Sequence, residues 1–300
     1  MNKVQKLWVC LTIIATSLWG VSGLIANEIF LLEPKVTPLL LSQLRMVFGG
    51  IVLLLLAGYR KEHPVAILKD RSSALQALAY GIFGIIPVQY CYFMAIKLGD
   101  ASIATILQFM APFFIILYLA IFKRQQPRRI EMISLVVSLF GVALLATHGD
   151  FTTLAFTPGV LIWGLLSGVG GATNTLIPRG ILEKYSSTTV TGWGLLLAGI
   201  GLILIHPSFA PFDLTLELLL LILTVIIFGT IVPFQIFMNA LKYIKPTTAS
   251  MLDAFEPIAA TIGSILFFGL QFRAADLLGA VLVIGSVLAL NWQPKSKKMY

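Results

Sequence analysis

The sequence predicts an all-α integral membrane protein whose ten transmembrane helices form two inverted five-helix repeats. Hydrophobic residues make up 58% of the 300 positions and charged residues only 11%, and the mean hydropathy of +0.94 lies outside the range of soluble domains. The chain contains ten apolar runs of about twenty residues, the length that a helix needs to cross about 30 Å of hydrocarbon. The two halves also resemble each other in sequence. These runs leave too little chain for a soluble catalytic domain.

Each apolar run is bounded by a short connector rich in Pro, His and charged residues. The first run follows Lys3 and Lys6 in the manner of a signal peptide, but further spans come after it, so we predict a first transmembrane helix. The expected helices cover residues 7–26, 38–58, 74–96, 102–122, 130–147, 158–178, 188–205, 216–241, 247–268 and 274–291.

The basic residues predict the orientation of the chain. All of the 21 Lys and Arg residues except Lys35, Arg45, Lys97 and Arg273 fall on the side that holds both termini and the loops after the even-numbered helices. Positive charge gathers in the cytoplasmic loops of membrane proteins. We therefore expect both termini in the cytoplasm and an even number of spans.

Composition and residue spacing argue against several other classes of protein. The net charge of +8 is also typical of nucleic-acid-binding proteins, but these charges are scattered through short loops, so no nucleic-acid partner is expected. Cys10 and Cys91 lie inside apolar runs, which argues against a disulfide or a thiolate metal site. His63, His148 and His206 fall in separate loops, outside any metalloprotease motif. We predict no metal, no cofactor and no enzymatic activity.

A shift of 145 residues aligns the second half of the chain with the first. Because each predicted repeat, 1–150 and 151–300, has an odd number of spans, the second repeat enters the membrane in the opposite sense. This inverted arrangement is typical of secondary transporters, whose substrate sites lie near the midplane between the halves. The shift pairs Phe83-Gly84 with Phe228-Gly229, Gln108 with Asp253 and Pro112 with Pro257, and a shift of 144 pairs Trp19-Gly20 with Trp163-Gly164.

These repeated motifs resemble the ten-helix EamA-type branch of the drug/metabolite transporter superfamily over nearly the whole chain. Ala, Leu and Pro recur at the same places in 104–112 and 249–257, and Glu256-Pro257 stands where many members carry an acidic residue before proline. The resemblance implies transport of a small molecule across the inner membrane, commonly export, through a central cavity lined by both halves. Many members have Glu shortly after helices 4 and 9, whereas this chain has Gln126 and Gln271. Any role that this Glu has in other members is therefore not assigned to Gln126 or Gln271 of this chain.

Asp253 and Glu256 are the strongest site candidates because an acid inside a span is costly, about 2.5 to 3.5 kcal/mol for a central Asp. If the ninth helix starts near residue 247, Glu256 lies about 13 Å along it, and the i,i+3 spacing places both acids on one face. A carboxyl there is suited to a cationic group or a proton. The alternatives are a structural, protonated Glu256 and an Asp253 that helps to start the helix.

Arg45, predicted about 10 Å into the second helix, has no basic counterpart in the other half. It can pair with an acid, hold a substrate carboxylate or snorkel to the outer surface, and we favour snorkelling or a structural ion pair. Trp19 and Trp163 are expected either to line the cavity or to pack beside the adjacent glycines. Asn174, between Gly171 and Pro178, marks an expected break in the sixth helix.

The other candidates are polar residues inside apolar runs, each of which is either a ligand contact or a hydrogen-bond link between helices. Gln108 is the most informative because it is the repeat equivalent of Asp253. The others are Gln89, Tyr90, Gln235 and Asn239.

The combined prediction is a secondary transporter of the plasma (inner) membrane that exports a small metabolite by alternating access. The expected substrate is amino acid-like, an amine or an amphipathic drug-like molecule. Protons are the candidate coupling ion. The expected partners besides the substrate are the lipid bilayer and, as an alternative to a monomer, a second copy of the chain in a homodimer. The competing functions are a lipid flippase of the same fold and an integral-membrane enzyme, which the missing His partner for the acids argues against.

Overall fold

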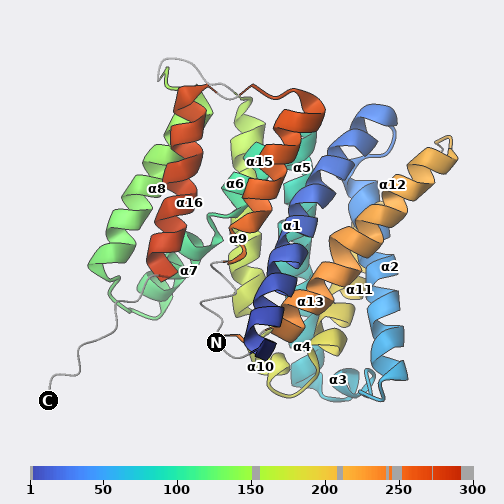
Figure 1. The fold of residues 1–300 in the computed structure, drawn as a ribbon. Coiled ribbons are helices and arrows are strands. Elements are labelled where there is room, and N and C mark those ends of the chain that lie inside the picture. The colour runs from blue at the N-terminus through green and yellow to red at the C-terminus, as the bar shows by residue number, and fades with distance from the viewer. Residues whose placement is uncertain are drawn as a thin grey trace, which may run out of the picture.

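The computed structural model describes residues 3–150, 156–207, 212–240, 243–244, 252–271 and 273–291. Within these residues every regular element is helical, and most helices run roughly along one common direction (Figure 1). In this described part of the chain, seven helical segments are long and apolar enough to cross a membrane, and two further apolar helices are shorter. The seven are Lys3–Leu32, Pro38–Tyr59, Arg71–Leu98, Ala101–Phe122, Pro158–Leu182, Ser187–Ile205 and Leu216–Ala240.

The structure therefore reproduces the predicted helices closely, although several spans are built from more than one helix. The start expected for the ninth helix, at residue 247, lies outside the described residues. The helices are α1 (Lys3–Leu32), α2 (Pro38–Tyr59), α3 (Ala66–Lys69), α4 (Arg71–Ala79), η1 (Tyr80–Ile85), η2 (Pro87–Cys91), α5 (Tyr92–Leu98), α6 (Ala101–Gln108), α7 (Ala111–Phe122), α8 (Arg129–Thr147), α9 (Pro158–Leu176), α10 (Arg179–Leu182), α11 (Ser187–Ile205), α12 (Leu216–Ile226), η3 (Ile227–Ile231), α13 (Val232–Ala240), α15 (Phe255–Phe268) and α16 (Ala274–Asn291).

Several helices begin at caps that can be read directly from the sequence. Thr37 accepts a hydrogen bond from the backbone N–H of Leu40, 3.1 Å away, and Pro38 takes the first helical position of α2, where its missing N–H costs nothing. Asp100 caps α6 in the same way, with its Oδ1 2.8 Å from the N–H of Ser102. These caps place helix starts next to the short connectors, as the sequence predicts.

The helix contacts follow the inverted repeat. Helix α1 packs against α15 and α13, and its repeat partner α9 packs against α6 and η2 in the same relation. The second helices of the two halves, α2 and α11, pack against each other, and so do the fifth helices, α8 and α16. Figure 1 shows the α8–α16 pair at one edge of the bundle. This exchange of contacts is the arrangement expected of two five-helix units related by a two-fold axis in the membrane plane.

In four of the spans, the irregularities also repeat between the two halves. The π-helical segments η1 and η3 overlap under the 145-residue shift, at Phe83-Gly84 and Phe228-Gly229. The fourth span turns at 109–110 between α6 and α7, and the ninth turns at 253–254 before α15. Proline causes both turns, because its ring clashes with the carbonyl four residues earlier, which belongs to Gln108 before Pro112 and to Asp253 before Pro257.

The observed helix interruptions correct two predictions. Asp253 and Glu256 do not lie on one face of a continuous helix, because Asp253 is in the turn and Glu256 is in the first turn of α15. In the sixth span, α9 continues through Asn174 to Leu176, and the interruption comes at Pro178 instead.

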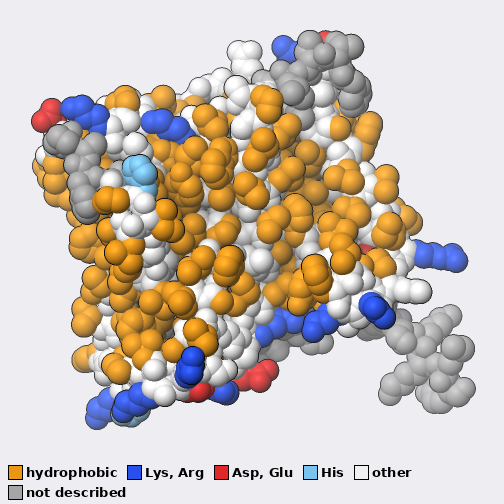
Figure 2. All heavy atoms as spheres, turned by 180° about the vertical axis from the view of Figure 1, so that it is seen from behind, with side chains coloured by type: hydrophobic (Ala, Val, Ile, Leu, Met, Phe, Trp, Pro, Cys, Tyr) orange, Lys and Arg blue, Asp and Glu red, His pale blue; other side chains and the backbone are white. Residues whose placement is uncertain are grey.

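The surface of the bundle is apolar around its middle. Figure 2 shows hydrophobic side chains over most of one face, with Lys and Arg mainly toward its upper and lower margins. Large side chains such as Leu55, Phe267 and Leu204 are exposed. Patches of this extent are not stable in water and mark contact with lipid. The protein is a multi-pass membrane protein.

We call the end of the bundle that holds the start of α1 the terminal end, and the other the far end. Helices α3, α4 and α10 lie at the terminal end, below the long helices in Figure 1. Their basic residues therefore share an end with Lys3 and Lys6, whereas Lys97, in the last turn of α5, and Arg273, between α15 and α16, lie toward the far end.

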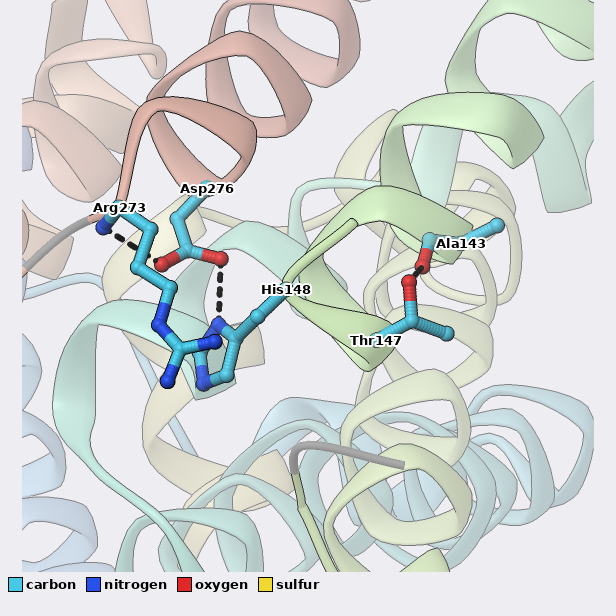
Figure 3. A network of polar contacts seen from close by, with 5 residues as sticks. All are labelled: Ala143, Thr147, His148, Arg273 and Asp276. Carbon is cyan, nitrogen blue, oxygen red and sulfur yellow. Dashed lines mark hydrogen bonds and ion pairs between the residues drawn. The ribbon is translucent and has the colours of Figure 1, made fainter. Parts of the chain in front are cut away.

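A polar cluster closes the far end of the α8–α16 pair (Figure 3). His148 follows α8 with a left-handed backbone, φ 49°, and its Nδ1 lies 2.5 Å from Oδ1 of Asp276. The other carboxylate oxygen of Asp276 accepts a hydrogen bond from the backbone N–H of Arg273, 2.8 Å away, where α16 begins. Asp276 is only 2% exposed. Below this cluster the two helices cross at Gly141 and Gly279, where an added Cβ on either would press on the carbonyl of the other.

Candidate functional site

A cavity of about 310 Å³ lies inside the bundle, at the small end of the usual range for ligand pockets. Helices of both repeats line it: α1, α2, η2, α5, α6 and α7 from the first, and α9, α13 and α15 from the second. The turns at 109–110 and 253–254 both border this space. The lining residues are Trp19, Ser22, Arg45, Val88, Gln89, Tyr92, Thr105, Gln108, Phe109, Ala111, Pro112, Ile115, Gly171, Asn174, Thr175, Phe234, Phe237, Met238, Asp253, Glu256 and Pro257.

The two acids of the ninth span face this cavity together. Asp253 reaches it from the turn before α15, and its Oδ1 is buried without a hydrogen-bond partner among the described residues. Glu256 reaches it from the first turn of α15, where the helix N-terminus favours negative charge. The two carboxyl groups interact electrostatically. The side chains remain neighbours even though the helix between them is interrupted.

Arg45 is buried beside the same cavity and does not snorkel. Its side chain is 5% exposed, its Nε donates to Thr230 Oγ1 and its Nη2 donates to the carbonyl of Gly229, both at 2.9 Å. The guanidinium carbon lies 4.8 Å from the centroid of the Phe93 ring. Both hydrogen bonds go to η3, so the widened turn of the eighth span holds the arginine in place. Arg45 also interacts electrostatically with Glu256.

Three predicted amide side chains line the cavity. Gln108 donates from Nε2 to the carbonyl of Val88, 2.7 Å away, and so links α6 to η2 while facing the cavity. Gln89 is 4% exposed, and both its Oε1 and Nε2 lack partners among the described residues. Asn174 Oδ1 is likewise buried without a partner. Buried polar atoms in proteins are nearly always paired, so such a group of orphans at one cavity indicates a ligand or water there.

The two equivalent tryptophans differ in their surroundings. Trp19 lines the cavity, with its ring centroid 5.2 Å from that of Phe234 and 5.3 Å from that of Phe237. Trp163 is outside the lining and packs edge-on against Tyr90, with centroids 5.8 Å apart. Tyr90 is outside the lining as well.

Gln235 and Asn239 also lie away from the lining. The Oε1 of Gln235 accepts weak hydrogen bonds from Arg60 Nη1 at 3.4 Å and Thr188 Oγ1 at 3.3 Å. Gln235 therefore links α13 to α2 and α11.

Sequence reasoning missed much of the cavity wall. Phe234, Phe237 and Met238 form part of it, but apolar residues inside an apolar span carry no signal that separates a cavity wall from a lipid contact. Thr105 was also missed. Its hydroxyl hydrogen-bonds to Tyr92 at 2.9 Å, and its place three residues before Gln108 is the one signal that was available.

Comparison with known proteins places the chain in a family. The model of the EamA-like transporter family matches twice, at residues 6–147 and 159–292. The uncharacterised inner membrane transporter YicL of Salmonella typhimurium is 29% identical over 283 residues, which are 93% of each chain. The threonine/homoserine exporter RhtA of Escherichia coli K12 is 25% identical over 99% of this chain and 97% of its own.

One solved crystal structure shares the fold, with a TM-score of 0.61, 18% sequence identity and coverage of 97% of both chains. Both of these relatives are named as transporters. A membrane bundle of two inverted repeats around a central cavity is also the architecture of a small-molecule transporter. The chain belongs to the EamA-like transporter family, as its repeated motifs indicated.

Proposed function

We propose that this protein exports a small amino acid-like or amine metabolite across the inner membrane by alternating access around the central cavity. The observation that carries the proposal is that one cavity, lined by both repeats, contains two acids, an arginine and several unpaired amide atoms. Polar groups deep in a membrane bundle are expensive and are retained where they bind or relay something. The similarity to a threonine/homoserine exporter over nearly the full chain supports export and an amino acid-like substrate.

A contact between the repeats supports alternating access. The hydroxyls of Ser102 in α6 and Thr261 in α15 share a hydrogen bond with an Oγ–Oγ1 distance of 2.7 Å. Both residues lie about one helical turn beyond cavity-lining residues, toward the far end. The contact therefore ties the two broken spans together above the cavity. Rocking one repeat against the other would break it and open the cavity to the far side.

Proton coupling is supported by the placement of the acids. Asp253 and Glu256 face the space that a substrate would occupy, so a proton and a cationic substrate group compete for the same carboxyls. The repeat equivalents of these residues are Gln108 and Ala111, which do not titrate. The second repeat alone supplies the groups for coupling.

We propose that the terminal end lies in the cytoplasm, because nearly all Lys and Arg residues of the predicted connectors fall on the side that includes the start of α1. Export then runs toward the far end. The division into repeats at about residue 150 and the homodimer stay predictions.

Transport in proteoliposomes tests the proposal. Wild-type protein and Glu256→Gln would be reconstituted with labelled threonine, leucine or an aliphatic amine inside, and efflux would be measured with and without an imposed pH gradient. Glu217→Gln is the matched control, since Glu217 is exposed at the start of α12, away from the cavity. We expect efflux that the gradient accelerates in wild type and Glu217→Gln, and at least about a tenfold loss in Glu256→Gln. Efflux that ignores both the gradient and Glu256→Gln would overturn coupling through these acids.

A further inference from the structure

The charged groups of the cavity are of opposite sign, but they are not paired with each other. Every ion pair among the described residues involves other side chains, and no carboxylate lies within 4 Å of the Arg45 guanidinium. Arg45 is nevertheless 5% exposed and lies in a span. A buried charge that lacks a directly paired counter-ion is costly, so an anion that contacts Arg45 would bind favourably.

Arg45 keeps hydrogen-bonding capacity for such an ion. A guanidinium has five N–H donors. Thr230 Oγ1 and the Gly229 carbonyl accept hydrogen bonds from Nε and Nη2, and Nη1 has no hydrogen-bond partner among the described residues. Because both partners belong to η3, the guanidinium is held at the cavity wall and needs no reorganisation to receive an anion.

Other cavity-lining residues carry buried polar atoms that lack hydrogen-bond partners among the described residues. Asp253 Oδ1 and Asn174 Oδ1 are buried acceptors without partners in the described part of the chain. Gln89, from η2, contributes both an unpaired acceptor and an unpaired donor. Glu256 adds a second carboxyl beside Asp253. A ligand that satisfies this cavity must therefore carry an anionic group for Arg45 and a hydrogen-bond-donating cation for the acids.

We infer that the cavity binds a small zwitterion, with its carboxylate at Arg45 and its ammonium group at Asp253 and Glu256, and that Arg45 is the residue that selects zwitterions over simple amines. This inference rests on the proposed transport function. A simple amine would leave Arg45 unpaired and facing a second positive charge. A simple carboxylic acid would bring a third carboxyl toward two others. Both arrangements are penalised in a medium of low dielectric constant. Trp19, Phe234 and Phe237 offer an apolar wall to the substituent of the zwitterion.

Matched ligands test this inference on the purified full-length protein. Leucine, its decarboxylated analogue isopentylamine and its deaminated analogue 4-methylpentanoic acid share one side chain. They differ in their charged groups: leucine carries both an ammonium and a carboxylate, and each analogue carries only one of the two. The corresponding phenylalanine and threonine sets cover other side chains. Binding is read from the ligand-dependent shift in Tm and converted to an apparent Kd. For at least one set, we expect the zwitterion to bind at least about tenfold more tightly than either analogue.

Two variants should then shift the preference for the zwitterion, one toward the amine and the other toward the carboxylic acid. Arg45→Gln removes the positive charge, so zwitterion binding should weaken by about tenfold or more while binding of the amine becomes tighter. Asp253→Asn removes one acid and should relatively favour the carboxylic acid. Arg60→Gln is the matched control, because Arg60 is exposed after the end of α2. A purely structural role of Arg45 would weaken all ligands together, and Asp253→Asn still tests the site if Arg45→Gln does not fold.

Two outcomes would overturn the inference. In the first, the amine binds wild type as tightly as the zwitterion, and the liposome assay shows that it is carried; transport then stands and zwitterion selection is wrong. In the second, no member of any set binds at millimolar concentration. Efflux of a different substrate that responds to Glu256→Gln would then preserve the proposed transport function alone.

Discussion

Gln108 and Asp253 occupy equivalent places in the two repeats, each four residues before the proline that interrupts its span and each beside the central cavity. The turn that proline causes is therefore shared by the two repeats, whereas the side chain four residues earlier is neutral in the first repeat and acidic in the second. The turn exists because proline cannot donate to the carbonyl four residues earlier. At 253–254 this leaves Asp253 in a turn, free of the geometry that a continuous helix would impose.

Replacing the proline of the ninth span should impair transport without unfolding the protein. In Pro257→Ala the new N–H can reach the Asp253 carbonyl and extend α15 backward, which removes a helix-breaking cost of about 3 kcal/mol. We expect an unchanged or higher Tm and at least about a tenfold lower efflux rate. Pro158→Ala, at the first position of α9, is the control and should change neither quantity. Full activity of Pro257→Ala would show that the turn is not needed.

Removing the hydroxyl contact between α6 and α15 should open the far side of the cavity. Hydrogen bonds between membrane helices are worth about 0.6 kcal/mol on average, so Ser102→Ala should shift the closed-to-open ratio about threefold. The reporter is a cysteine introduced at Thr105, in a background in which Cys10 and Cys91 are replaced by alanine. A larger open population should appear as faster labelling of this cysteine by an impermeant thiol reagent added from the far side. Ser102→Thr keeps a hydroxyl and should label at the original rate. Equal rates in all variants would mean that the contact does not hold the cavity closed.

The His148–Asp276 contact should contribute to stability alone. Asp276→Ala and His148→Ala each remove one partner of a contact in which Asp276 is buried, and we expect about 1 to 3 kcal/mol of destabilisation and a lower Tm. Arg273→Ala is a sharp control, because it is the backbone N–H of Arg273 that bonds to Asp276. The α8–α16 pair does not line the cavity, so efflux per folded molecule should stay at the wild-type value. A selective loss of efflux would contradict this assignment.

The packing of α9 against η2 should not tolerate a side chain at Gly170. A Cβ there would overlap the backbone at Pro87 and Val88, which cannot move aside as a flexible side chain does. We expect Gly170→Ala to lower Tm and the yield of folded protein, with a destabilisation of about 1 to 3 kcal/mol typical of overpacking. Gly285→Ala, with nothing within 4 Å of the added atom, should instead be neutral or stabilising by up to about 1 kcal/mol.

Acid should weaken the cap of α4. The pKa of Asp70 is lowered from its ordinary value of 3.8, chiefly by the hydrogen bond from Ser73 and also by Ser72 and Lys184. A carboxyl with a lowered pKa in the folded state adds stability above its unfolded pKa and loses it as the pH falls. The Tm difference between wild type and Asp70→Asn should therefore be greatest at neutral pH and shrink below pH 3.8. A difference that does not vary with pH would show that the charge of Asp70 contributes nothing.

The sequence was sufficient for the helices and for the relation between the halves, because long apolar runs and charged connectors carry a strong physical signal. It also identified most of the polar cavity residues, including Glu256, Asp253, Gln108 and Gln89, because polar groups are rare and costly inside a span. Which partner each one meets was not predictable. Snorkelling or a structural ion pair was favoured for Arg45, but η3 supplies two neutral acceptors that hold it inside the bundle.

Repeat symmetry was a poor guide to individual aromatic residues. Trp19 and Trp163 are equivalent in sequence, yet only Trp19 borders the cavity, because Phe234 and Phe237 stand beside it while Tyr90 covers Trp163. The position of the break in the sixth span was also misjudged. Asn174 is accommodated in a regular helix, and the missing N–H of Pro178 determines where α9 gives way to α10.

The uneven distribution of charge around the cavity has an energetic consequence for the transport cycle. In an inverted repeat, the inward-open and outward-open states arise when the two halves exchange conformations, and identical halves would make the two states equal in free energy. Here Arg45, Asp253 and Glu256 correspond to Val190, Gln108 and Ala111, so exchange moves every charge of the cavity into a different environment. The empty protein is therefore expected to populate mainly one of its two states. Binding of substrate or protons would then determine how far the ratio of the inward-open to the outward-open state changes.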